Sequence, residues 1–201
     1  MDKVTADENI ALMMRVRGGD ESAFEILFNR FQRPLLNFFY GLSRNSGLAR
    51  DLAQETFLRV WKIRKRYQAS GTFQAYLFGI GRMIWLEWCR REQKSWRLGQ
   101  RQGEERLQEL AGGVADCPAY QANRAELSAQ IHDALEQLPE EQRLVFVLRS
   151  IDGLSLDDIA NILDCPVNTV RSRKILAVKK LRHLLAPLFR AEETESASIG
   201  T

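Results

Sequence analysis

Residues 168–174 place polar and basic side chains at the start of a predicted helix: Asn168, Thr169, Arg171, Ser172, Arg173 and Lys174. Such side chains, together with the free N–H groups of a helix N-terminus, bind phosphate oxygens and base edges. Upstream, Ser155 and Asp158 form a capping-box pattern that starts a two-turn helix, and Pro166 lies in the short turn that follows. The pattern predicts a helix–turn–helix that reads the DNA major groove. The alternative is an ordinary helical hairpin with a charged exposed face.

A second group lies on one predicted helix in the first half of the chain: Asp51, Leu52, Gln54, Glu55, Phe57, Leu58 and Trp61. Asp51 and Glu55 are four residues apart and therefore share a helix face. Paired carboxylates could serve catalysis or bind a metal, but no histidine accompanies them at helical spacing. An apolar ridge with a polar rim favours a surface that binds another protein.

Aromatic and basic residues alternate in the stretch that follows: Arg64, Lys65, Arg66, Tyr67, Phe73, Tyr76, Arg82, Trp85, Trp88, Arg90 and Arg91. Aromatic rings stack on unpaired bases, and basic side chains bind the phosphate backbone. Single-strand binding and a plain core role for the rings both remain open at this point.

The elements that must position these groups are helical. Apolar residues recur at helical spacing over 22–42 (one helix, or two that meet near Pro34), 48–66 and 73–93, and no long alternating run occurs. Residues 144–148 could form a buried strand, but the charged residues before them and Gly153 after them favour a helix. The sequence therefore predicts an all-α protein of two small helical domains joined by a flexible linker: extension 1–20, first domain 21–94, linker 95–123, second domain 124–187 and disordered acidic tail 188–201.

Composition excludes several classes of protein. The 201 residues are 45% hydrophobic and 27% charged, which is typical of a soluble globular protein. No apolar run approaches the roughly 18–20 residues of a membrane span, and the N-terminus does not resemble a signal peptide. Three widely spaced cysteines fit a reducing cytosol, and two histidines leave little for a zinc site or a catalytic triad. We expect a cytoplasmic protein with no catalytic residues, metal or cofactor.

The net charge of +3 conceals strong patterning. Residues 59–66 hold five basic side chains and no acid, and residues 171–182 hold six basic side chains and no acid. Residues 82–106 are also rich in arginine. Separate basic clusters predict a polyanion bound at more than one place.

At these residues the chain resembles a bacterial RNA polymerase sigma factor of the extracytoplasmic-function group. GDESAFEILFNRF and DLAQETFLRVW resemble the opening of that group's first conserved domain and its polymerase-binding helix. FQAYLFGIGRMIWLEWCRR resembles the helix that melts the promoter and reads its minus-ten element, although Tyr76 stands where the family usually has Trp. The segment from LEQLPEEQ to VKKLR resembles the second domain, which recognises the minus-35 element. The resemblance covers about residues 20–94 and 126–185.

The resemblance implies a role for each group. Asp51, Gln54, Glu55 and Phe57 would bind core RNA polymerase, and Tyr76 and Arg82 would line the site for the non-template strand. Asn168, Thr169, Arg171, Ser172, Arg173 and Lys174 would face the upstream promoter element. It also implies control by an anti-sigma factor. We therefore expect two separate helical modules that bind two promoter elements, with the basic recognition helix exposed.

Two rival functions belong to other classes of protein. A helix–turn–helix regulator that is not a polymerase subunit would need a sensor or dimerisation domain in place of residues 20–94. An enzyme would use Asp51 and Glu55, so their replacement by alanine would abolish turnover instead of polymerase binding.

Overall fold

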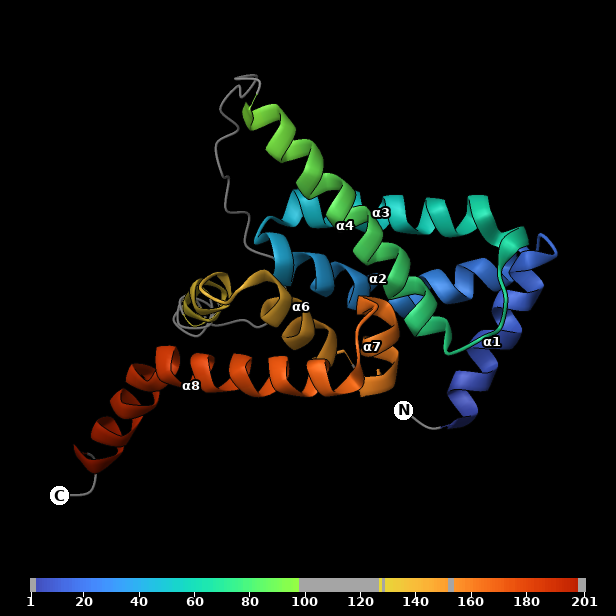
Figure 1. Cartoon of the computed structure of the whole chain (residues 1–201). Coiled ribbons are helices and arrows are strands. Elements are labelled where there is room, and N and C mark those ends of the chain that lie inside the picture. Colours follow the sequence, from blue (N-terminus) through green and yellow to red (C-terminus); the bar gives the residue numbers. More distant parts are fainter. Residues whose placement is uncertain (1–2, 98–126, 128, 152–153, 199–201) are drawn as a thin grey trace.

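Helices make up the structure, a computed structural model that describes residues 3–97, 127, 129–151 and 154–198 (Figure 1). Within these ranges there is no strand, so the predicted all-α fold is confirmed. The predicted linker falls almost entirely outside them, and only its first three residues are described, as part of a helix.

The first group of helices follows the predicted apolar periodicity: α1 (Lys3–Arg17), α2 (Glu21–Ser43), α3 (Ser46–Ile63), the short 3-10 helix η1 (Arg64–Arg66) and α4 (Phe73–Arg97). The chain turns between α1 and α2 at Gly19, whose φ of 98° is strained for any residue with a side chain. Asp20 then caps α2 by accepting a hydrogen bond from the Ala23 N–H at 3.0 Å. α2 continues through Pro34, so the two-helix alternative is wrong.

The second group contains helical residues 129–136, α6 (Glu140–Arg149), α7 (Leu156–Leu163) and α8 (Val167–Ser198). Residues 144–148 lie in α6, which confirms the helix and not the strand. The predicted capping box at Ser155 and Asp158 is present, with both reciprocal hydrogen bonds. Asp164, in the left-handed conformation, ends α7 before the turn to α8.

α8 differs from the prediction at its C-terminal end. The disordered tail was expected to begin at residue 188, but α8 extends to Ser198. Residues 188–198 contain no glycine or proline and include alanine, glutamate and arginine, which are good helix formers. Their helix propensity outweighs the acidic, serine-rich composition on which the prediction rested.

The two groups of helices pack against one another. α6 lies along α2 and α7 lies along α4 (Figure 1), and one hydrophobic core runs from Phe38 and Phe78 of the first group to Val147 and Ile162 of the second. The two groups of helices correspond to the two predicted helical domains, and in this conformation they share a hydrophobic core. The apolar faces of α6 and α7 that do not pack on α8 are buried against the first group instead of facing water.

Candidate nucleic-acid and protein interfaces

The N-terminal face of α8 is open, as the sequence predicted. Asn168, Arg171 and Ser172 are exposed, while Val170 between them is fully buried and anchors the helix. The Ser172 hydroxyl donates to the Asn168 carbonyl at 2.9 Å, and Thr169 donates its N–H to the Pro166 carbonyl at 2.8 Å. Arg171 is in none of the ion pairs found among the described residues, and its Nη1 makes only a long hydrogen bond of 3.5 Å to the Asn168 side chain, so most of its guanidinium is available to a ligand.

Arg173 does not share that open face. Its side chain is 23% exposed, pairs with Glu141 of α6 and donates to the Cys165 sulfur at 3.6 Å. Lys174 is also only partly exposed. Arg173 therefore joins α8 to α6 and to the preceding turn. The sequence alone shows two arginines on one helix and does not distinguish the surroundings of Arg173 from those of Arg171.

An apolar residue completes the open face. Ile175 is 65% exposed and lies three and four residues after Ser172 and Arg171, on the same side of α8. A large exposed apolar side chain among basic ones could contact a thymine methyl group. Ile175 was not among the predicted DNA-binding residues, although its helical spacing from Arg171 and Ser172 is visible in the sequence.

A groove lies on the face shared by α2 and α3. It measures about 470 Å³ and is lined by Glu21, Phe24, Phe28, Gln54, Phe57, Leu58 and Trp61. Leu58 is 58% exposed and lies in this groove beside several aromatic residues, so together they form an exposed apolar patch. The groove contains the apolar ridge that the sequence predicted on α3, and the aromatic residues from α2 complete it.

The four residues proposed for polymerase binding play different parts around this groove. Asp51 and Gln54 are exposed on α3. Glu55 pairs with Arg59 at 3.0 Å, and Arg59 also pairs with Glu87 of α4 at 2.8 Å. Phe57 is buried, with its ring 4.8 Å from that of Phe28, so it forms the floor of the groove and not its rim.

The predicted single-strand site lies near the start of α4. The rings of Tyr67 and Tyr76 meet edge to face with centroids 4.8 Å apart, and both hydroxyl groups are buried without a hydrogen-bond partner. Burial raises the pKa of each tyrosine. The Trp85 and Trp88 rings stack 5.2 Å apart, and the Trp85 indole N–H is also buried without a partner.

Arg82 is only partly exposed on this helix. Its Nη1 donates to the Ile162 carbonyl of α7 at 3.2 Å, and its Nε is buried without a partner. Nearby, the Thr72 hydroxyl donates to Asp158 of α7 at 3.1 Å. Thr72 and Arg82 lie on either side of Tyr76 along the chain, so α7 contacts the α4 region beside the predicted single-strand site.

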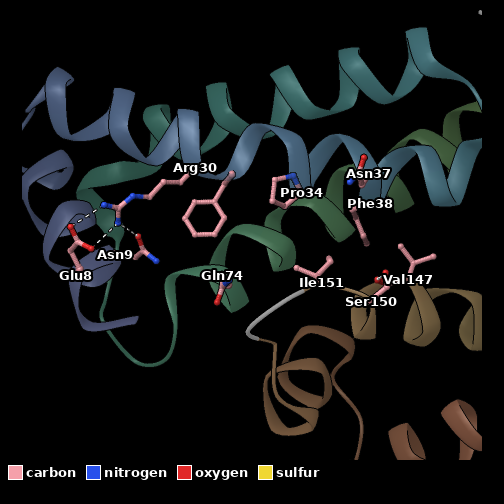
Figure 2. A pocket seen from close by; sticks show the side chains of 11 residues that line it. Glu8, Asn9, Arg30, Pro34, Asn37, Phe38, Gln74, Val147, Ser150 and Ile151 are labelled. Carbon is pink, nitrogen blue, oxygen red and sulfur yellow. Dashed lines mark hydrogen bonds and ion pairs between the residues drawn. The ribbon is translucent and has the colours of Figure 1, made fainter. Parts of the chain in front are cut away.

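Further contacts join the two groups of helices at the α2 side of their interface. Arg44, directly after the end of α2, pairs with Asp133, and the Tyr40 ring of α2 lies 4.6 Å from that of His132. A cavity of about 510 Å³ interrupts this interface (Figure 2). Arg30, paired with Glu8 at 2.9 Å, lies on one side of it, and residues of α6 and the following turn lie on the other.

Among the described residues, no group of three or more histidine, cysteine, aspartate or glutamate side chains could hold a metal ion. Burial raises the pKa of the Cys89 thiol to about 11, with a further contribution from Glu140, so it is a poor nucleophile. Within the part of the chain that the structure describes, no helix is long and apolar enough to cross a membrane.

Comparison with known proteins finds one family match for each of the two groups of helices. Residues 27–95 match the family described as Sigma-70 region 2, and residues 128–181 match Sigma-70, region 4. The ECF RNA polymerase sigma-E factor of Haemophilus influenzae is 30% identical over 89% of this chain and 95% of its own length. The RNA polymerase sigma-H factor of Pseudomonas aeruginosa is 29% identical over 93% of this chain and 98% of its own length.

Solved structures show the same fold at lower identity. CnrH, in complex with the cytosolic domain of CnrY, is 24% identical, with a TM-score of 0.66 over 88% of this chain and 96% of that one. The sigma factor RpoE of Bartonella quintana, in complex with the anti-sigma factor NepR, is 24% identical, with a TM-score of 0.63 over 81% of this chain and 96% of that one.

Proposed function

The chain belongs to the extracytoplasmic-function group of sigma-70 RNA polymerase sigma factors, and from this premise we propose how its surfaces divide the work of transcription initiation. The α2–α3 groove binds core RNA polymerase, and the N-terminal face of α8 reads the minus-35 duplex. The first turns of α4, with the loop 67–72, hold the minus-ten non-template strand. The protein directs polymerase to promoters and performs no catalysis of its own.

The groove supports the polymerase assignment. It is apolar at its centre, with Phe24, Leu58 and Trp61, and polar at its edge, with Glu21 and Gln54. Asp51 is exposed three residues before Gln54 on α3. This is the anatomy of a protein-binding surface, in which apolar anchors are surrounded by a polar rim. Phe57 acts indirectly, because it supports the rings that a partner touches.

The open face of α8 supports duplex reading and is the observation that carries this part of the proposal. Arg171 is exposed and in no ion pair of the described residues, so it can bond two acceptors of a guanine in the major groove, and Ile175 can contact a thymine methyl group. Asn168, Thr169 and Ser172 at the helix start contact phosphate or base edges. Arg173 positions α8 through Glu141.

Control by an anti-sigma factor belongs to the same proposal. Two similar structures were solved in complex with a protein partner. RpoE is bound to the anti-sigma factor NepR, and CnrH is bound to the cytosolic domain of CnrY. We propose that this chain has a protein partner of the same kind. It would act in the cytoplasm, where core polymerase and promoter DNA are found.

Polymerase binding is tested by replacing Leu58 with aspartate. The exposed position tolerates a charge in the free protein, but the groove would then present a carboxylate to an apolar partner. The labelled variant should bind purified core polymerase at least tenfold more weakly than the wild type in an equilibrium titration. Met14→Asp, at another exposed apolar position, is the matched control and should bind as the wild type does.

The rival function gives a different result. A helix–turn–helix regulator would bind duplex DNA through α8 but would not co-elute with core polymerase. If the wild-type protein fails to bind core polymerase, or if Leu58→Asp binds as tightly as the wild type, the assignment of the groove is wrong.

A further inference from the structure

The cavity of about 510 Å³ shown in Figure 2 takes its walls from elements that are far apart in the sequence. α1, α2 and the first turn of α4 line it from the first group of helices, and α6 with the turn after it lines it from the second. None of its lining residues belongs to the α2–α3 groove. Cavities of roughly 300–1,000 Å³ at the meeting of two domains are common sites for small ligands.

Buried carboxamide groups distinguish this cavity from a simple packing gap. Aromatic residues aside, three polar side chains of the described residues are buried, and two of them, Asn9 at 3% exposure and Gln74 at 4%, line the cavity. The third is Thr56, whose hydroxyl donates to the Leu52 carbonyl within its own helix. A carboxamide carries both hydrogen-bond donors and acceptors. The cavity therefore brings both kinds of group to the wall of an otherwise apolar space.

The charged groups at the cavity neutralise each other. Of the described residues that line it, Glu8 and Arg30 alone are charged, and they pair from Nη1 to Oε2 at 3.1 Å and from Nη2 to Oε1 at 2.9 Å. Arg30 Nη1 also donates to the Asn9 Oδ1 at 2.9 Å. The bonds from Arg30 lower the pKa of Glu8, so the pair is ionised at neutral pH and has no net charge. A charged ligand would lose its hydration here without gaining an unpaired opposite charge.

Aromatic side chains form much of the remaining wall, and neighbouring rings hold them in place. The Phe31 ring lies 5.2 Å from that of Phe73, and the Phe38 ring lies 5.5 Å from that of Phe78. α6 and the turn after it close the opposite side (Figure 2). A pre-formed apolar wall with a few polar groups is typical of small-molecule sites. Rings in the wall favour a flat ligand, because aromatic pairs gain energy beyond the area that they bury.

We propose that this cavity binds an uncharged, flat molecule with an amide-like edge, the chemistry shared by aromatic carboxamides and nucleobases. The ring of the ligand lies against Phe31 and Phe38, and its donor and acceptor bond the carboxamides of Asn9 and Gln74. The chain is then a receptor for a small metabolite as well as a sigma factor. A bound molecule touches both groups of helices and stabilises the folded protein by mass action.

Three probes that share one ring and differ in charge test this chemistry. Benzamide is an uncharged carboxamide, benzoate is an anion and benzamidine is a cation. Titration of the full-length protein, followed by ligand-detected NMR, should give benzamide a dissociation constant at least fivefold lower than that of either charged probe. Because a ligand of the folded state raises Tm, benzamide should also raise Tm more than benzoate does at the same concentration.

Asn37→Trp tests the place of binding. Asn37 is exposed on α2 and lines the cavity, so an indole at this position can enter the space without loss of a buried group. The matched control is Asn29→Trp, at an exposed position of the same helix outside the lining. Benzamide should bind Asn37→Trp at least fivefold more weakly than the wild type, and should bind Asn29→Trp as it binds the wild type.

Gln74→Met tests the carboxamide itself. Methionine is unbranched and of similar length, but it offers no N–H donor and only a weak acceptor. The variant should bind benzamide at least fivefold more weakly than the wild type. Circular dichroism should show that the helix content is unchanged. If the folded variant binds benzamide as tightly as the wild type, Gln74 does not recognise the ligand and the proposal is wrong.

The α2–α3 groove is the competing place for an aromatic probe, and Leu58→Asp examines it. This variant should bind benzamide as the wild type does, whereas loss of binding would place the probe in the groove and contradict the proposal. Equal affinities for the three probes, equal binding to both tryptophan variants, or no benzamide binding up to its solubility limit would also overturn it. None of these results depends on polymerase, so the proposed function is tested separately.

Discussion

The N-terminal face of α8 and the first turns of α4 carry similar chemistry in different surroundings. Both present arginine and hydroxyl groups on a helix, yet Arg171 is exposed whereas Arg82 is bonded to the Ile162 carbonyl of α7. The comparison teaches that residue type and helical spacing identify a nucleic-acid reader but do not determine whether it is accessible.

The same lesson holds within α8. Arg171 and Arg173 are two residues apart, and therefore point in different directions from the helix. The first is free for a ligand, and the second is paired with Glu141. Variants of the two arginines can therefore distinguish reading from positioning.

Arg171→Ala should produce the largest change. Loss of a bidentate base contact costs about 1–3 kcal/mol, or roughly 5- to 150-fold in affinity for a specific minus-35 duplex. Quantitative footprinting with reconstituted holoenzyme checks the effect, with Lys179→Ala as a control at an exposed basic position further along α8. Unchanged occupancy would mean that α8 does not read bases through Arg171.

Tyr67→Phe should stabilise the folded protein. The substitution removes a buried hydroxyl that has no partner, a group whose burial costs about 1–3 kcal/mol. For a chain of this size, a gain of about 1 kcal/mol raises Tm by roughly 2–4 °C. Calorimetry of the free protein measures it. A lower Tm would show that the Tyr67 hydroxyl has a hydrogen-bond partner in solution. The difference between the α8 face and the α4 region would then be smaller.

Arg173→Ala should have a smaller effect, on stability more than on base reading. Its ion pair with the exposed Glu141 contributes about 0–1 kcal/mol to the free energy of unfolding. Urea denaturation checks this, and Glu141→Ala should cost a similar amount, with less than additive loss in the double variant. If Arg173→Ala instead weakens duplex binding as strongly as Arg171→Ala, Arg173 is a base reader.

The smallest effect concerns the pairing of α3 with α4. The hydrogen bonds from Arg59 lower the pKa of Glu87 from its ordinary value of 4.5. A carboxyl group with a lowered pKa stabilises the fold above its unfolded pKa, and this stabilisation is lost as pH falls through the folded pKa. Exposure to solvent limits it to a few tenths of a kcal/mol.

A pH series measures that effect. Between pH 7 and pH 3, the wild type should lose slightly more stability than Glu87→Gln, whose side chain does not titrate. Identical pH profiles would mean that the Arg59–Glu87 pair contributes nothing to holding α4 against α3.

Local features could be predicted from the sequence because neighbouring residues determine them. The caps at Asp20 and Ser155 and the helix over 144–148 are examples. The surroundings of Arg82 and Arg173 could not be predicted, because their partners lie 80 and 32 residues away along the chain. The α2–α3 groove was half predicted: its α3 ridge follows from spacing, but Phe24 and Phe28 reach it only through packing of the two helices.

The most direct test of the account is single-round run-off transcription by purified core polymerase on a library of genomic promoter fragments, with and without this protein. The account predicts transcripts that require the protein and start at a fixed distance from two shared short elements, with Arg171→Ala weakening dependence on the upstream one. The account would be contradicted if the folded protein binds DNA but its addition changes neither the amount nor the start sites of the transcripts made by core polymerase.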